Sequence, residues 1–158
     1  MKKITVFVCA AAIACSMSFP AFAAQTKKEY NAESAQVRQE LADTSKSIKG
    51  IQESNRTAAD ACKAAKKSWK DNGQLKEHKE DWKQVLELKD DITEVHVSYV
   101  EASSQCRILK AQAKNDVKDG RYDDAIGKLN QALEQKKEAL QHMEQIQGIW
   151  SQIDALLN

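Results

Sequence analysis

The sequence predicts an all-α protein, an elongated bundle of about four helices that follows an N-terminal export signal. Beyond residue 31, apolar residues recur at alternating intervals of three and four, the spacing that lines up side chains on one helix face. The single Pro of the 158-residue chain, Pro20, lies in the leader and interrupts none of the expected helices. Strand-like alternation is confined to Val95-His96-Val97.

Residues 1–23 have the features of a secretory signal peptide. Lys2 and Lys3 precede a short apolar run, and Ala21-Phe22-Ala23 forms an A-x-A cleavage signal. We expect cleavage after Ala23 and a chain located in the periplasm, with secretion as the alternative. The apolar run is too short to serve as a membrane anchor, and no later stretch predicts membrane insertion.

A lipoprotein signal is the other interpretation of this leader. It would require Cys15 to be the lipidated residue, but Ala12 stands where such signals usually have an aliphatic residue. We therefore expect three parts: a signal peptide over 1–23, a short polar and flexible arm over 24–31, and a single helical domain over 32–158.

The first expected helix, 32–71, follows a thin stripe that includes polar and small residues. The stripe positions are Leu41, Thr44, Ile48, Ile51, Asn55, Ala58, Cys62, Ala65 and Trp69. Asp71-Asn72-Gly73 predicts its end, because Gly or Asn just past a helix can adopt the left-handed conformation that closes it.

Three further helices are expected, over about 74–89, 91–118 and 122–157. The break near Asp91 rests on Asp91-Ile92-Thr93-Glu94, an Asp with Glu three residues later, which is the spacing of a capping box. Lys118-Asp119-Gly120 predicts the end of the third helix, and apolar residues from Tyr122 to Leu157 define the fourth.

A shift of 47 positions aligns part of the chain with itself, including Gly73 with Gly120 and Leu86 with Leu133. The alignment indicates either two helical-hairpin repeats or coincidence in a chain rich in Lys, Glu and Ala. Residues 119–126, followed by Leu129, Ala132 and Leu133, resemble the turn and second helix of a tetratricopeptide hairpin over residues 109–137. The resemblance implies a groove that binds a protein segment, although the family's period of 34 is absent.

Cys62 and Cys106 are the two cysteines beyond the leader. In an exported protein a disulfide between them is expected, and two buried free thiols are the alternative. The disulfide depends on the break near Asp91, which would let the third helix run parallel to the first. In a straight hairpin turning at Gly73, the two residues would lie roughly 30 Å apart, whereas a disulfide needs Cα atoms within about 7 Å.

The sequence shows no constellation expected of an enzyme or a metal site. His78, His96 and His142 have no Glu three places earlier, so the Glu-x-x-His pattern of di-iron bundles is absent. There is no G-x-S-x-G turn and no phosphate-binding Gly loop. We expect no catalytic residues, no metal and no cofactor.

Charge gives no indication of a nucleic-acid partner. Without Lys2 and Lys3 the chain holds 22 basic and 23 acidic residues, a net charge of −1. A lysine-rich stretch over 63–83, which also contains Trp69 and Trp82, suggests either a surface for an anionic envelope component or the polar face of an amphipathic helix.

These observations predict a non-enzymatic periplasmic protein, a scaffold, adaptor or chaperone-like factor that binds a protein partner in a groove between helices. The residues expected to shape this groove are Trp69, Trp82, Tyr122, Leu129 and Trp150. Two alternatives stay open: a carrier that holds a ligand or metal in the bundle interior, and a structural coiled-coil rod completed by self-association.

Overall fold

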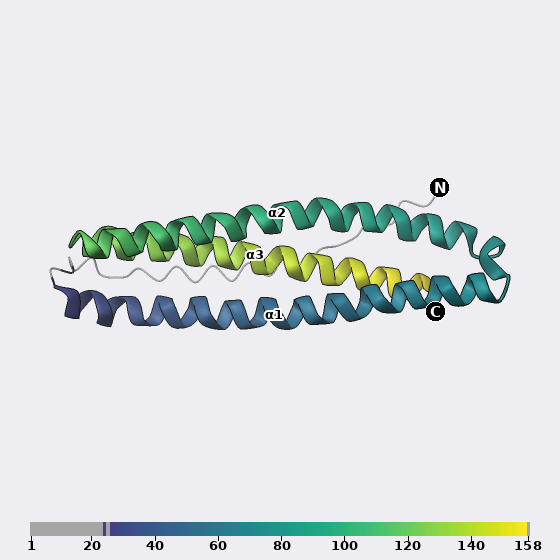
Figure 1. Cartoon of the computed structure of the whole chain (residues 1–158), viewed down its shortest axis with the longest axis horizontal. Helices are drawn as coiled ribbons and strands as arrows, with labels where there is room; N and C mark the ends of the chain where they lie inside the picture. The colour runs from purple at the N-terminus through teal and green to yellow at the C-terminus, as the bar shows by residue number, and fades with distance from the viewer. Residues whose placement is uncertain (1–23, 25, 158) are drawn as a thin grey trace.

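The computed structural model describes Ala24 and residues 26–157, and this part of the chain is all-α (Figure 1). Helix α1 covers Lys27–Asp71, α2 covers Lys79–Lys118 and α3 covers Tyr122–Leu157. A short 3-10 helix, η1, covers Gln74–Lys76 between the first two. The expected helical class is confirmed, but the bundle has three long helices and not four. The expected signal peptide lies outside the described residues.

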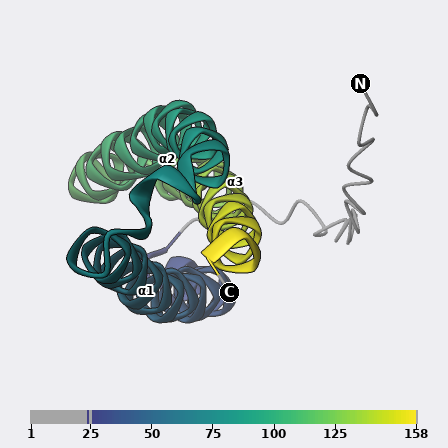
Figure 2. The ribbon, with the colours of Figure 1, turned by 90° about the vertical axis from the view of Figure 1, so that its right-hand side faces the viewer.

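Helix α3 lies between the other two helices and holds the bundle together. The chain runs out along α1, returns along α2 and runs out again along α3, which packs against both partners (Figure 1). The backbones of α1 and α2 come close at isolated points at most, and viewed along the bundle they diverge from each other on the side away from α3 (Figure 2).

Small residues at seven-residue intervals allow α3 to approach both neighbours closely. Ala125, Ala132 and Ala139 are completely buried, and the larger Ile146 and Ile153 continue the same row. A seven-residue repeat keeps one seam of a helix facing its neighbours, as in coiled coils. An alanine side chain extends no further than a methyl group, so these three positions leave room for the neighbouring helices.

The core consists of two clusters along the bundle. One gathers the start of α1, the end of α2 and the start of α3, with Val37, Cys106 and Leu129 among its buried members. The other gathers the remaining lengths and includes Cys62 and Val85. Long helices with a narrow apolar seam bury residues in a line, so the core is extended.

The expected break near Asp91 is wrong, because α2 continues from Lys79 to Lys118 without interruption. Ile92 and Val95 pack on the same cluster as Val85 and Leu88. The buried face of α2 therefore continues across the expected break without a change of register. Asp91 and Glu94 are exposed on this continuing helix. Their capping-box spacing is thus the ordinary polar face of a helix interior.

The start of α1 lies within the segment expected to be a flexible arm. Thr26 caps the helix: its hydroxyl accepts a hydrogen bond from the Glu29 N–H at 3.2 Å, and the Glu29 carboxylate accepts one from the Thr26 N–H at 2.9 Å. Tyr30 is buried. The Ala24 nitrogen donates to Asp123 at 2.5 Å. The start of α1 thus contacts the start of α3, although its residues are mostly polar.

Both inter-helix turns contain a glycine in the left-handed region, at the two positions where the sequence predicts helix ends. Gly73 has φ of 72° and Gly120 has φ of 75°, and no other residue of the described chain has positive φ. A side chain at either position would be strained. The helices on either side of Gly120 have 40 and 36 residues, so they extend far beyond the tetratricopeptide-like span 109–137.

The expected disulfide is not formed: Cys62 and Cys106 are both buried free thiols. Cys62 of α1 shares a core cluster with Val85 of α2. Cys106 lies on α2, 21 residues after Val85. At helical rise this separates the two cysteines by about 30 Å. Because α2 is uninterrupted, the bundle has no fourth helix, and Cys106 lies too far from Cys62 for a disulfide.

Candidate binding groove

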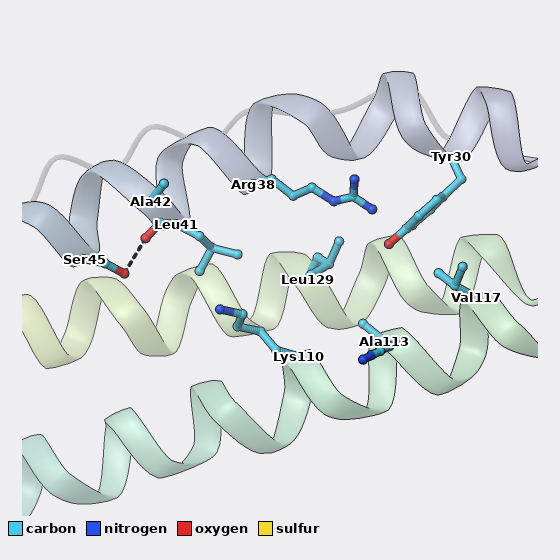
Figure 3. Close-up of a pocket in the computed structure, with 10 residues that line it drawn as sticks. Tyr30, Arg38, Leu41, Ala42, Ser45, Lys110, Ala113, Val117 and Leu129 are labelled. Atoms are coloured by element: carbon cyan, nitrogen blue, oxygen red, sulfur yellow. Dashed lines mark hydrogen bonds between the residues drawn. The ribbon is translucent and has the colours of Figure 1, made fainter.

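A groove lies between α1 and α2 near the turn that contains Gly120, with α3 as its floor (Figure 3). Its volume is about 440 Å³. Helix α1 contributes one wall, α2 the other, and Leu129 of α3 lies between them. The lining residues are Tyr30, Arg38, Leu41, Ala42, Ser45, Lys110, Ala113, Lys114, Val117 and Leu129.

Three cations and no carboxylate line this groove. Arg38 comes from α1, and Lys110 and Lys114 come from successive turns of α2. The Arg38 guanidinium lies over the Tyr30 ring, 5.0 Å from its centroid, and Figure 3 shows the two side chains directed toward each other along the same wall. A near-neutral chain thus concentrates positive charge at one concave site, which favours an anionic ligand.

Apolar side chains of all three helices line the groove together with the cations. Leu41, Ala113 and Leu129 are at most 6% exposed, and Val117 packs against the same cluster. Ser45 stands at the margin, where its hydroxyl donates to the Leu41 carbonyl at 2.7 Å. The groove therefore combines an apolar base with a cationic rim, a pattern suited to an amphipathic and acidic ligand.

Polar and aromatic contacts between elements define the two ends of the groove. At one end the rings of Tyr30 and Tyr122 pack together with centroids 5.8 Å apart. Beyond Ser45, the Gln52 side-chain amide of α1 donates to the Tyr99 hydroxyl of α2 at 2.9 Å, which joins the two walls. Along α1, the residues that line the groove therefore lie between the Tyr30–Tyr122 and Gln52–Tyr99 contacts.

The five residues expected to shape one groove are distributed along the bundle. Leu129 lines the groove, and Tyr122 contacts Tyr30 at its end. Trp150 is buried in the other core cluster. Trp69 and Trp82 lie near the α1–α2 turn, with ring centroids 6.4 Å apart in an edge-to-face arrangement.

The tryptophans belong to an aromatic and cationic cluster that closes the α1–α2 turn. The His78 ring stacks on Trp69 at 4.1 Å with an interplanar angle of 3°, and Lys66 Nζ lies 4.3 Å from the Trp82 centroid. Trp69 is 8% exposed. The cluster packs α1 against α2 where the chain reverses. This structural role is sufficient to explain these aromatic side chains.

Sequence reasoning missed Arg38, Lys110 and Lys114. On the sequence they are ordinary charges on polar helix faces. If the expected helix 91–118 ran parallel to the first helix, Lys110 and Lys114 near its end would lie far from Arg38. The antiparallel return of an unbroken α2 brings these side chains to one groove, and an unbroken apolar phase through residues 85–99 is the signal that could have found it.

Within the described residues, no group of three or more His, Cys, Asp and Glu side chains is arranged to hold a metal ion. None of the helices in that part of the chain has a segment long and apolar enough to span a bilayer. Comparison with protein-family models, curated proteins and solved structures finds no match to this chain.

Proposed function

We propose that this protein is a non-enzymatic, exported interaction protein that binds an acidic amphipathic segment of a protein partner in the groove between α1 and α2. The observation that supports the proposal is the lining: Arg38, Lys110 and Lys114 around an apolar floor, with no acidic side chain among the lining residues. The leader sequence supports a location in the periplasm, where the partner would be met, with secretion as the alternative.

The dimensions of the groove favour a helical segment. Its α1 wall extends from Tyr30 to Ser45, about 22 Å at helical rise, and its α2 wall from Lys110 to Val117, about 10 Å. The two walls together would contact roughly two turns of a bound helix. An amphipathic helix would lay its apolar face on Leu41 and Leu129 and direct carboxylates toward the cations. Binding of this kind, a helix in a groove, uses anchors repeated every three to four residues.

The two parts of the lining have different energetic roles. Each exposed ion pair contributes about 0.5 kcal/mol and is weakened by salt. Burial of apolar anchor side chains contributes about 25 cal/mol per Å² of area removed from water. The floor therefore supplies affinity, and the cations select acidic over basic segments.

Binding of designed peptides tests the proposal. The probe is a fluorescent amphipathic helix with a leucine face flanked by Glu, and its counterpart carries Lys in place of Glu. We expect the Glu peptide to bind more tightly. The double substitution Lys110→Glu/Lys114→Glu should weaken it at least about tenfold, which corresponds to 1.4 kcal/mol.

The matched control is Lys46→Glu/Lys49→Glu, which makes the same charge change at exposed positions of α1 outside the groove. This control should bind like the wild type. Equal weakening by both double variants would show that only net charge matters, and it would refute groove binding.

A second candidate ligand is a small anionic amphiphile, such as a fatty acid. The observation that favours it is the volume of about 440 Å³, which lies within the usual range of small-molecule sites. Displacement of the bound Glu peptide by a long-chain fatty acid, lost in the Lys110→Glu/Lys114→Glu variant, would indicate a carrier role. Absence of displacement would leave the protein segment as the ligand.

A further inference from the structure

The backbone nitrogen of Ala24 contacts a carboxylate on another helix. It donates to Asp123 Oδ1 at 2.5 Å, and the two residues are 99 positions apart in the chain. Ala24 is 5% exposed and belongs to the core cluster that contains Tyr30 and, at its edge, Tyr122. The first residues of a domain are ordinarily poorly ordered unless a contact ties them down, and here the contact is with the start of α3.

Two further contacts place this nitrogen beside α3. The capping box of Thr26 and Glu29 fixes the start of α1 just after Ala24. The rings of Tyr30 and Tyr122 pack together and join the first turns of α1 and α3. Asp123 follows Tyr122 in the first turn of α3, so its carboxylate lies next to the point where the chain enters α1.

The expected cleavage after Ala23 changes the chemistry of this nitrogen. In the uncleaved chain it is a neutral amide with one N–H. Hydrolysis by an endopeptidase adds one water across the Ala23–Ala24 peptide bond, so that the leader leaves with a carboxylate and Ala24 keeps an α-ammonium group. An α-amino group is ordinarily protonated at neutral pH. Its contact with the Asp123 carboxylate is then an ion pair in which both partners carry charge.

We propose that removal of the leader creates this ion pair, and that the new N-terminus of Ala24 thereby joins the start of α1 to the start of α3. The position of cleavage matters, because consecutive Cα atoms are about 3.8 Å apart and an amine moved by one residue no longer lies at the carboxylate. The pair lies beside Tyr30, which also lines the binding groove. The inference rests on the export included in the proposed function.

A comparison of free and acetylated N-termini tests the ion pair in the processed chain, residues 24–158. Acetylation keeps the N–H of Ala24 and removes its charge. It should lower the melting temperature of the wild type by about 2–4 °C and that of Asp123→Asn by less than about 1 °C, because the variant has no charge left to pair. Equal effects of acetylation in the two proteins would overturn the proposal.

The matched control is Asp124→Asn. Asp124 is exposed in the same turn of α3, so this variant removes the same charge beside the same helix N-terminus. Acetylation should affect it as strongly as the wild type. If acetylation loses its effect in both variants, the amine responds to the general charge of this turn and not to Asp123, which contradicts the ion pair.

An aminopeptidase gives a second measurement. Release of Ala24 should be at least about tenfold faster from Asp123→Asn than from the wild type or Asp124→Asn, because a paired amine must be freed before the peptidase can bind it. Equal release from all three proteins would refute the pairing.

Sequencing of the N-terminus after export tests the cleavage step. Ala24 should be the first residue, and a different first residue would overturn the proposal at this step. None of these measurements involves a groove ligand. Loss of peptide binding with an intact ion pair would therefore refute groove binding alone, and the opposite result would refute only the ion pair.

Discussion

Asp116 shows how one side chain fixes the turn between α2 and α3. It is 2% exposed, and its carboxylate lies 2.6 Å from Lys128 Nζ and 2.5 Å from the Arg121 guanidinium. A backbone hydrogen bond also holds this turn, because the Arg121 N–H donates to the Asp116 carbonyl at 2.8 Å. Hydrogen bonds from Lys128 and then Arg121 hold the pKa of Asp116 below its ordinary value of 3.8.

We expect Asp116→Asn to lower the melting temperature at neutral pH by several degrees, because the amide leaves the two cations without a balancing charge. A carboxyl with a lowered pKa stabilises the fold above its ordinary pKa of 3.8, and this contribution is lost as pH falls through the lower, folded-state pKa. The difference between wild type and variant should therefore shrink in acid. Thermal melts followed by circular dichroism across pH measure both effects.

Asp119→Asn is the control for this experiment. Asp119 contacts the same Arg121 at 3.0 Å, but its side chain is 55% exposed. It should change the melting temperature little. A difference between wild type and Asp116→Asn that is constant down to strongly acid pH would contradict the role assigned to the carboxylate.

At the scale of elements, α3 owes its central place to its alanine seam. The helix has neighbours on two sides, and Ala125, Ala132 and Ala139 are completely buried. Larger residues at these positions would push the helices apart, since interiors are packed nearly as densely as organic crystals. The pattern of apolar and polar residues alone does not distinguish an alanine seam from a row of large apolar side chains.

Ala132→Leu should destabilise the protein by about 1–3 kcal/mol, the usual cost of overpacking a well-filled core. Chemical denaturation monitored by circular dichroism gives the free energy of unfolding. Ala35→Leu makes the same change at an exposed position of α1 and should have an effect within about 0.5 kcal/mol. If the two variants are equally stable, α3 is not closely packed at this position.

At the scale of the whole molecule, the continuity of α2 determines which residues meet. Cys62 and Cys106 lie in different core clusters, which follow one another along the bundle. The same topology places Arg38 beside Lys110 and Lys114 at the groove. One unbroken helix thus separates the cysteines and assembles the cationic site.

Both thiols should stay free after incubation of the folded protein with a mild oxidant. Labelling of residues 24–158 with a maleimide after unfolding should then modify both Cys62 and Cys106, as it does in a fully reduced control. A disulfide within the chain would protect both from labelling. Complete protection would show that the helices are arranged differently from the hairpin described above.

The periodic apolar pattern was sufficient to predict the helices, and the positions of Gly73 and Gly120 to predict the two turns. It did not predict the number of helices, because Asp91 and Glu94 have capping-box spacing whether they start a helix or lie on its exposed side. A groove between helices was expected, and that it binds a protein segment stays a proposal. Of its lining, only Leu129 was named.

The sequence by itself determined the local features, which are all-α structure from apolar periodicity and turns from glycine. The export signal in the leader stays a prediction. Only the tertiary structure decided that α2 is continuous, that the cysteines stay apart and that three cations line one groove. The physical reason is that helical periodicity fixes which side chains share a face of one helix. Which faces meet depends on the packing of all three helices, which local spacing does not encode.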